Sequence, residues 1–154
     1  MDFIKLGCKK EIKPLIAKWY FDQWGKNIQD STLLSFNRKL EDYLNIDHIP
    51  FVILAIEDDT VLGAAHIRFH EMTIYPEKTH WLGGVYVDKP HRAKGVATSL
   101  VKHMEELAIS LNIMTLHLQT ENLTGGLYAA LGWQPDEQVN YNGVDVLVMS
   151  KQLI

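Results

Sequence analysis

The chain has 154 residues, of which 47% are hydrophobic and 22% charged, and this excludes a mainly disordered or collagen-like protein. With 15 Lys and Arg against 19 Asp and Glu, the formal charge of -4 excludes the overall basic excess that drives nucleic-acid binding. We therefore expect a single domain over residues 1–154, long enough to bury one substantial core, with no nucleic-acid partner.

Hydrophobic periodicity predicts an alternation of strands and helices along the whole chain. Apolar residues three and four positions apart predict amphipathic helices, whereas short runs of β-branched and apolar residues predict strands. The predicted order is strand, helix, helix, three strands, helix, strand, helix, and a final hairpin. In that order, the predicted elements cover residues 3–6, 12–24, 33–44, 51–56, 61–69, 81–87, 96–111, 113–118, 123–131 and, for the hairpin, 139–148.

Local signals support these boundaries. Pro14 falls in the first turn of the first helix, where a missing N–H group is tolerated. Ser31 is a candidate N-cap for the second helix. The pairs Asp58–Asp59 and Asn142–Gly143 are turn signals that predict two antiparallel hairpins.

Cysteine usage and hydropathy predict a cytoplasmic protein. Cys8 is the only cysteine, so an internal disulfide cannot form. The N-terminus has no basic segment followed by an apolar run and a small-residue cleavage site. Apolar runs stay short of the roughly 18 residues that cross a bilayer. We expect neither a secreted protein nor a membrane partner.

Residues 85–98 have the features of an anion-binding site. A strand stops at Pro90, and a basic loop then leads into the best helix of the chain. Gly95 lets a bulky anion approach the backbone of a helix N-terminus, which exposes unpaired N–H groups, while Arg92 and Lys94 add positive charge. A phosphate-bearing ligand fits this arrangement. The alternative interpretation is a basic turn that needs only a glycine.

Two motifs in this region resemble those of the GNAT superfamily of N-acetyltransferases. Residues 92–97, preceded by Val87 and Pro90, are similar to the acetyl-CoA loop of the superfamily, Arg/Gln-x-x-Gly-x-Gly/Ala after a strand ending in Val-x-Pro. Residues 127–133, Leu-Tyr-Ala-Ala-Leu-Gly-Trp, are similar to the superfamily pattern Leu-Tyr-x-x-x-Gly-Phe. The element order also resembles this fold over nearly the whole chain. The sequence is identified as a small, bacterial-type, single-domain member.

The resemblance implies a fold and a reaction. The fold is α/β (α+β), a mixed and mostly antiparallel sheet of about seven strands flanked by about four helices, with strands four and five splayed. The reaction is direct attack of a primary amine, on a small molecule, a peptide N-terminus or a lysine, on acetyl-CoA in a ternary complex without a metal. The alternative is a catalytically degenerate module that binds coenzyme A and acts in regulation. Monomer and homodimer both stay open.

The resemblance also implies site residues. Tyr128 matches the tyrosine thought to protonate the departing thiolate. Backbone groups of residues 85 and 87 would bind the pantetheine arm, and N–H groups of residues 92–97 would hold the pyrophosphate. Asn122 lies six residues before Tyr128, one fewer than usual. The predicted cofactor-binding residues are Val85, Tyr86, Val87, Arg92, Ala93, Lys94, Gly95, Val96, Ala97, Thr98 and Asn122.

The general base is missing from its usual place. A lysine-type ammonium, with a pKa near 10.4, must lose a proton before its nitrogen can attack. Members of the superfamily often carry Glu or His on the inward face of the fourth strand, but residues 81–87 contain neither. A base acting through water is one option. The candidates just outside the strand are His80, Glu57, His66, Glu71 and Tyr141.

Two other groups of residues have a structural interpretation. His66 and His70, with Glu71 beside them, have a spacing that would suit a metal on a helix, but the local pattern is a strand. We interpret both histidines as residues of one sheet face and expect no metal site. The four tryptophans are interpreted as packing residues, with the alternative that Trp24 and Tyr20 line an acceptor pocket.

Overall fold

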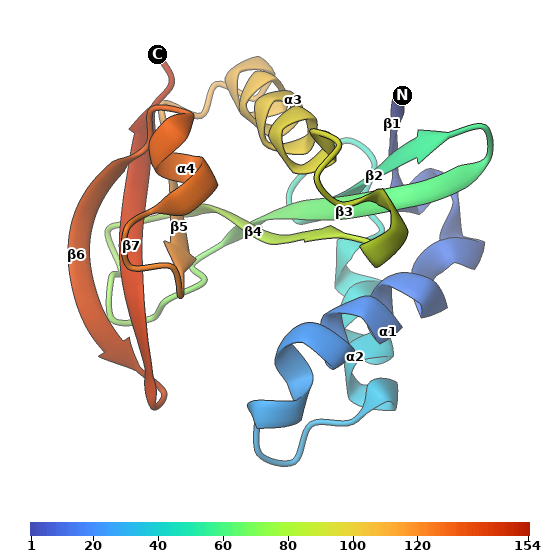
Figure 1. The fold of residues 1–154 in the computed structure, drawn as a ribbon, viewed down its shortest axis with the longest axis horizontal. Helices are drawn as coiled ribbons and strands as arrows, with labels where there is room; N and C mark the ends of the chain where they lie inside the picture. Colours follow the sequence, from blue (N-terminus) through green and yellow to red (C-terminus); the bar gives the residue numbers. More distant parts are fainter.

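The computed structural model describes residues 1–154, the side chain of Asn27 excepted (Figure 1). Strands and helices follow one another in the predicted order. In chain order they are β1 (Asp2–Lys5), α1 (Lys13–Trp24), α2 (Leu33–Lys39), β2 (Phe51–Glu57), β3 (Thr60–Phe69), β4 (His80–Val87), α3 (Val96–Ser110), β5 (Thr115–Thr120), α4 (Gly126–Ala130), β6 (Gln134–Tyr141) and β7 (Val144–Gln152). No helix in the described part of the chain is long and apolar enough to cross a membrane.

One mixed sheet holds all seven strands, in the order β1-β2-β3-β4-β5-β7-β6. Every neighbouring pair is antiparallel except β4 and β5, which are parallel and meet at one pair of residues, Trp81 and His117. Beyond that pair the two strands separate, and β6 and β7 run almost across the direction of β3 and β4 (Figure 1). The predicted fold class, including the splayed fourth and fifth strands, is confirmed.

Helices cover both faces of the sheet, with α3 on one side and α1 and α2 on the other (Figure 1). In β2, Phe51 and Ile53 belong to the core beneath α3, while Val52 and Leu54 belong to the core beneath α1. This two-sided burial explains why β2 is a continuous apolar run instead of an alternating one. Trp19, Trp81 and Trp133 are buried, as the packing interpretation predicted.

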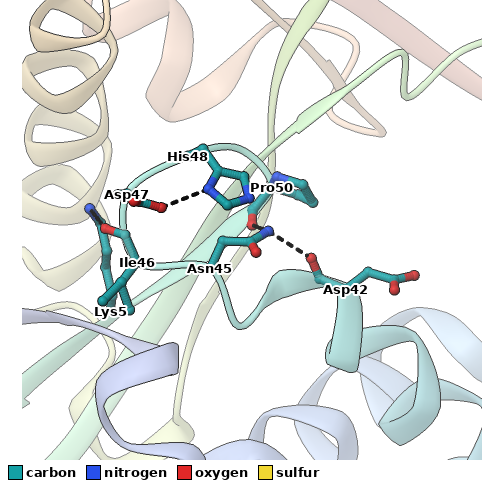
Figure 2. Close-up of polar contacts among 7 residues, drawn as sticks. All are labelled: Lys5, Asp42, Asn45, Ile46, Asp47, His48 and Pro50. Carbon is teal, nitrogen blue, oxygen red and sulfur yellow. Dashed lines mark hydrogen bonds and ion pairs between the residues drawn. The ribbon is translucent and has the colours of Figure 1, made fainter.

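Both predicted hairpin turns are confirmed. Asp58 and Asp59 each have a positive φ, as do Asn142 and Gly143, which is the backbone conformation that two-residue turns between twisted strands require. At the opposite end of β2, the side chain of Asn45 closes the loop that precedes the strand. Its Nδ2 donates to the backbone oxygen atoms of Asp42, at 3.1 Å, and of Pro50, at 2.8 Å (Figure 2).

Other element ends differ from the predictions. The N-cap of α2 is Thr32, not Ser31. Thr32 Oγ1 accepts from the Ser35 N–H at 3.0 Å and Ser35 Oγ accepts from the Thr32 N–H at 2.9 Å, a reciprocal capping box. The hydroxyl of Ser31 instead donates to the Gly25 carbonyl. Helix α2 is also shorter than predicted, because the chain tightens into a 3₁₀ turn over Leu40–Tyr43.

The C-terminal elements are shifted for a similar reason. Helix α4 starts three residues later than predicted because Gly125, its N-cap residue, has a φ of +87°, which a regular helix does not allow. Strand β5 covers Thr115–Thr120 and not residues 113–118. Ile113 is buried in the turn after α3, so its apolar character reflects core packing and not strand pairing.

Lys151, on β7, connects three elements around the C-terminal half of the sheet. Its Nζ lies 2.5 Å from Oε1 of Glu105 on α3 and donates to the Leu131 carbonyl at the end of α4 at 2.8 Å. The Glu105 side chain is only 11% exposed. Removing one member of such a pair leaves a charge buried without compensation. Lys151 therefore holds α4 and α3 against β7.

We expect Lys151→Met to lower the free energy of unfolding in urea by about 3 kcal/mol, because Glu105 would stay buried and unpaired. The double variant Glu105→Leu/Lys151→Met should recover most of that loss. Lys102→Met, at an exposed position on α3, is the control and should change stability little. If the single and double variants are equally destabilised, the ion pair is not the source of the effect.

Candidate active site

A cleft of about 550 Å³ opens where β4 and β5 separate. It brings together the two sequence motifs, the strand-to-helix loop before α3 and the short helix α4, with the C-terminal end of α1 on its rim. The residues that line it are Gln23, Trp24, Val85, Tyr86, Val87, His91, Arg92, Ala93, Gly95, Val96, Ala97, Thr98, Thr120, Asn122, Gly125, Gly126, Leu127 and Tyr128. The cleft therefore contains every predicted cofactor-binding residue except Lys94, which is exposed and does not line it.

The N-terminus of α3 faces this cleft with bare backbone. Gly95 is the N-cap residue, has a φ of +81°, and offers no side chain to the helix. The first turn thus leaves the N–H groups of Val96, Ala97 and Thr98 without helical acceptors. A Cβ atom added at Gly95 would meet no other atom within 4 Å, so the backbone is open to a large group. These donors and the helix dipole suit a pyrophosphate.

Arg92 lies against the end of β4 instead of pointing freely into solvent. Its Nε donates to the Val87 carbonyl at 2.7 Å, and its guanidinium lies 5.3 Å from the centre of the Tyr86 ring. The Val87 carbonyl thus accepts one hydrogen bond from within the chain and keeps a second lone pair. Val85 lines the cleft on the side of β4 that faces β5, where strand pairing has ended.

Tyr128 lies half-buried on α4 at the wall of the cleft. Its ring packs edge-on against buried Trp133, with 6.2 Å between the ring centres. Burial, helped by the negative charge of Glu71, raises the pKa of Tyr128 to about 12. The phenol is therefore a neutral hydrogen-bond donor throughout the physiological pH range.

Asn122 has a structural task as well as a place in the cleft. Its Oδ1 accepts from the N–H of Thr124 at 3.1 Å and from Oγ1 of Thr124 at 2.7 Å, so it shapes the turn that leads into α4. A Cβ atom at Gly126 would lie 2.6 Å from its Nδ2, which explains a glycine at that position. Asn122 therefore lines the cleft, although it is one residue closer to Tyr128 than is usual in the superfamily.

The structure separates the five candidate bases. Glu57 is exposed at the β2–β3 turn, His80 lies beside Phe69 at the start of β4, and Tyr141 packs at the tip of the last hairpin. His66 and Glu71 come together instead, with 3.8 Å between Nε2 and Oε1. Both lie beside Gly83 on β4, close to the pair of residues at which β4 and β5 begin to separate.

The expectation that His66 and His70 lie on one sheet face is wrong for His70. His70 follows the end of β3, has a φ of +47°, and donates its N–H to the Thr79 carbonyl at 2.9 Å, so it does not continue the face that carries His66. Among the described residues, no three His, Cys, Asp or Glu side chains are grouped so that they could hold a metal ion.

Sequence reasoning did not predict several residues of the cleft. Gln23 and Trp24, at the end of α1, line it, whereas core packing was the favoured interpretation of Trp24. The ring of Trp24 lies 6.4 Å from that of Tyr86 on β4, so it packs and lines the cleft at once. In the sequence, the only signal was that Tyr20 and Trp24 are four residues apart and therefore share one face of the helix. Which end of α1 reaches the cleft depends on the tertiary fold.

The family model "Acetyltransferase (GNAT) family" matches residues 13–133. No curated protein matches the chain in sequence. Solved structures similar to the chain include a ribosomal-protein-alanine N-acetyltransferase from Brucella melitensis, with 20% identity over 99% of both chains and a TM-score of 0.78.

Two further similar structures are aminoglycoside 6'-N-acetyltransferases. One, complexed with coenzyme A, has 17% identity, covers 100% of this chain and 98% of its own, and has a TM-score of 0.78. The other, from Enterococcus faecium, has 17% identity over the same shares with a TM-score of 0.75. At these identities the structures establish the fold, and the family model covers most of the sequence. The chain therefore belongs to the acetyltransferase (GNAT) family.

Proposed function

We propose that this protein transfers the acetyl group of acetyl-CoA to a primary amine by direct attack in a ternary complex. One observation carries the proposal. A single cleft joins the bare N-terminus of α3, which suits a pyrophosphate, to Tyr128, whose hydroxyl suits a leaving sulfur. The separation of β4 from β5 leaves the edge of β4 unpaired between the two, where an extended pantetheine arm would lie.

Each part of the cleft has a separate task in this proposal. The N–H groups of the first turn of α3 hold the pyrophosphate, and the free edge of β4 at Val85 aligns the arm. Tyr128 donates a hydrogen bond to the sulfur as the carbon–sulfur bond breaks. Acetyl-CoA is the co-substrate that supplies the acyl group, and Cys8, which is exposed and does not line the cleft, takes no part.

The acceptor is a primary amine on a small molecule, a peptide N-terminus or a lysine. The similar structures include an aminoglycoside 6'-N-acetyltransferase and a ribosomal-protein-alanine N-acetyltransferase, so both acceptor classes belong in a first screen. The alternative is a module that binds coenzyme A without transfer. This alternative is favoured by the two glycines of β4, because members of the superfamily often carry a Glu or His base on that strand. The retained Tyr128 supports the enzyme.

The binding half of the proposal is tested at Gly95. We expect Gly95→Asp to raise the Kd for acetyl-CoA, measured by isothermal titration, by about 100-fold, because a carboxylate would face the pyrophosphate. Gly143→Asp is the matched control. Gly143 also has a positive φ and open space around it, but lies in the β6–β7 turn, and its substitution should leave the Kd unchanged. Equal effects of both variants would contradict the assignment.

The chemical half is tested at Tyr128 by thiol release with an aminoglycoside, an alanine-terminated peptide and spermidine as acceptors. We expect Tyr128→Phe to lower kcat about 100-fold while the Kd for acetyl-CoA changes less than about threefold. Because the pKa of Tyr128 is about 12, the phenol is protonated throughout pH 6–9 and the defect should be the same across that range. Binding without release for every acceptor would favour the degenerate module.

A further inference from the structure

The surface of β4 opposite α3 is covered by side chains that come from other elements. A Cβ atom added at Gly83 would lie 2.6 Å from Oε1 of Glu71 and 2.7 Å from Nε2 of His66. A Cβ atom added at Gly84 would lie 2.5 Å from Nδ1 of His66 and 2.5 Å from Oη of Tyr20. A carboxylate and an imidazole thus occupy the space into which side chains of β4 itself would otherwise project.

These groups are buried, and several lack a partner. In the described part of the chain, Tyr20 Oη and both ring nitrogen atoms of His66 are buried without a hydrogen bond. Tyr20 is only 6% exposed, so its hydroxyl cannot turn to bulk water. Each such atom loses the hydrogen bonds that water provides in the unfolded chain and so destabilises the fold. Unpaired polar atoms around two glycines indicate a place shaped for a polar ligand and not for packing.

Glu71 links this cluster to the opening between the strands. Its Oε2 accepts from Nε2 of Gln119 at 2.9 Å. Gln119 lies on β5 two residues after His117, and Gly83 lies on β4 two residues after Trp81, the residue that pairs with His117. The hydrogen bond therefore crosses the point at which β4 and β5 separate. Oε1 faces His66 at 3.8 Å, too far for a hydrogen bond.

Glu71 and His66 are similarly buried, with side chains 15% and 13% exposed, but their polar atoms differ in their surroundings. The two nitrogen atoms of His66 are sealed by their neighbours, with Tyr43 packed on one side of the ring at 5.3 Å between centres. The charge of Glu71 reaches Tyr128, where it contributes to the raised pKa. Oε1 of Glu71, which lies beside Gly83 and beyond hydrogen-bond distance of His66, is therefore the oxygen atom of this cluster that is available to a ligand donor.

We propose that Glu71 binds the ammonium group of the acceptor and takes its proton, with His66 and Gln119 as positioning residues. The proposal rests on the acetyl transfer proposed above and assigns its base to the β3–β4 connection instead of to β4. Gly83 and Gly84 are then necessary, because any side chain there would displace the carboxylate or the imidazole. The acceptor class that fits is a primary alkylamine, which is cationic at neutral pH.

The transfer balances with these groups. The acceptor nitrogen forms a bond to the acetyl carbon, the carbon–sulfur bond breaks, and the ammonium gives up two protons. Glu71 takes the first proton before attack and releases it to solvent. The second replaces the proton that Tyr128 gives to the departing sulfur.

Several ionisable groups surround the carboxylate and belong to the same electrostatic environment. His66 faces it from β3, Tyr128 from α4, and Tyr43 from the 3₁₀ turn after α2. Tyr20 approaches from α1, with a pKa raised by burial, and is a neutral donor. Arg68 and Asp42 act on Tyr43 with opposite effects on its pKa. Glu71 is the carboxylate of this group that lies beside Gly83.

The test uses the full chain and the acceptor from the thiol-release screen with the highest turnover. Glu71→Gln keeps the shape of the side chain and an oxygen that can accept from Gln119, but cannot take a proton. At pH 7 we expect kcat to fall about 100-fold, with the Kd for acetyl-CoA changed less than about threefold. Glu57→Gln, an exposed carboxylate at the β2–β3 turn, is the matched control and should match the wild type.

The pH dependence separates proton transfer from a structural role. The pH series uses spermidine or another acceptor with a lysine-type amine, whose free fraction rises about 300-fold between pH 7 and pH 9.5, so the need for a base declines. The ratio of wild-type to Glu71→Gln turnover should therefore shrink at least about tenfold over this range. A ratio that stays constant, or a change in KM with kcat unchanged, would overturn the assignment of the proton to Glu71.

A second variant tests the position of the base without changing Glu71 itself. Gly83→Ala would place a methyl group 2.6 Å from Oε1 of Glu71 and should reproduce the loss of turnover, again with acetyl-CoA binding intact. Wild-type turnover in Gly83→Ala would contradict the proposed position of the base. If the wild-type protein fails to bind acetyl-CoA, the proposed function is wrong and this inference is wrong with it. If Glu71→Gln binds acetyl-CoA and turns over like the wild type, only this inference is wrong.

Discussion

The structure depends on the failure of β4 and β5 to pair along their lengths. Neighbouring parallel strands normally form hydrogen bonds along their whole overlap. Here β4 and β5 are paired at only one position, Trp81 and His117. Every feature of the candidate site is placed by that separation. It exposes the edge of β4 in the middle of a sheet, opens the cleft, and directs the loop before α3 and the helix α4 toward each other.

An exposed strand edge inside a sheet would be a liability unless something stabilised the two halves. The core beneath α3 includes residues of β2, β3, β4, β5 and β7, so apolar packing supports the junction that hydrogen bonds do not. Lys151 adds a polar connection between β7, α3 and the end of α4. The cleft can therefore stay open without an extended ladder between its walls.

The same separation explains how catalytic groups are distributed in the proposed reaction. Binding is assigned to backbone groups at Gly95 and at the edge of β4, which depend on local conformation and not on side-chain identity. Proton transfer is assigned to two side chains from different connections, Tyr128 after β5 and Glu71 after β3. The charge of Glu71 contributes to the raised pKa of Tyr128, so the two groups are electrostatically coupled.

The order of strands and helices and both hairpin turns were predictable from the sequence, because each depends on periodicity or on φ preferences within a few residues. The two cleft motifs were recognised by their resemblance to those of the GNAT superfamily. The ends of α2 and α4 were less predictable, since a capping box at Thr32 and left-handed glycines decide them locally. Only the tertiary structure decided which base candidates meet. His66 and Glu71 approach Gly83 through strand register and the β3–β4 loop, and neither leaves a signal in hydrophobic periodicity.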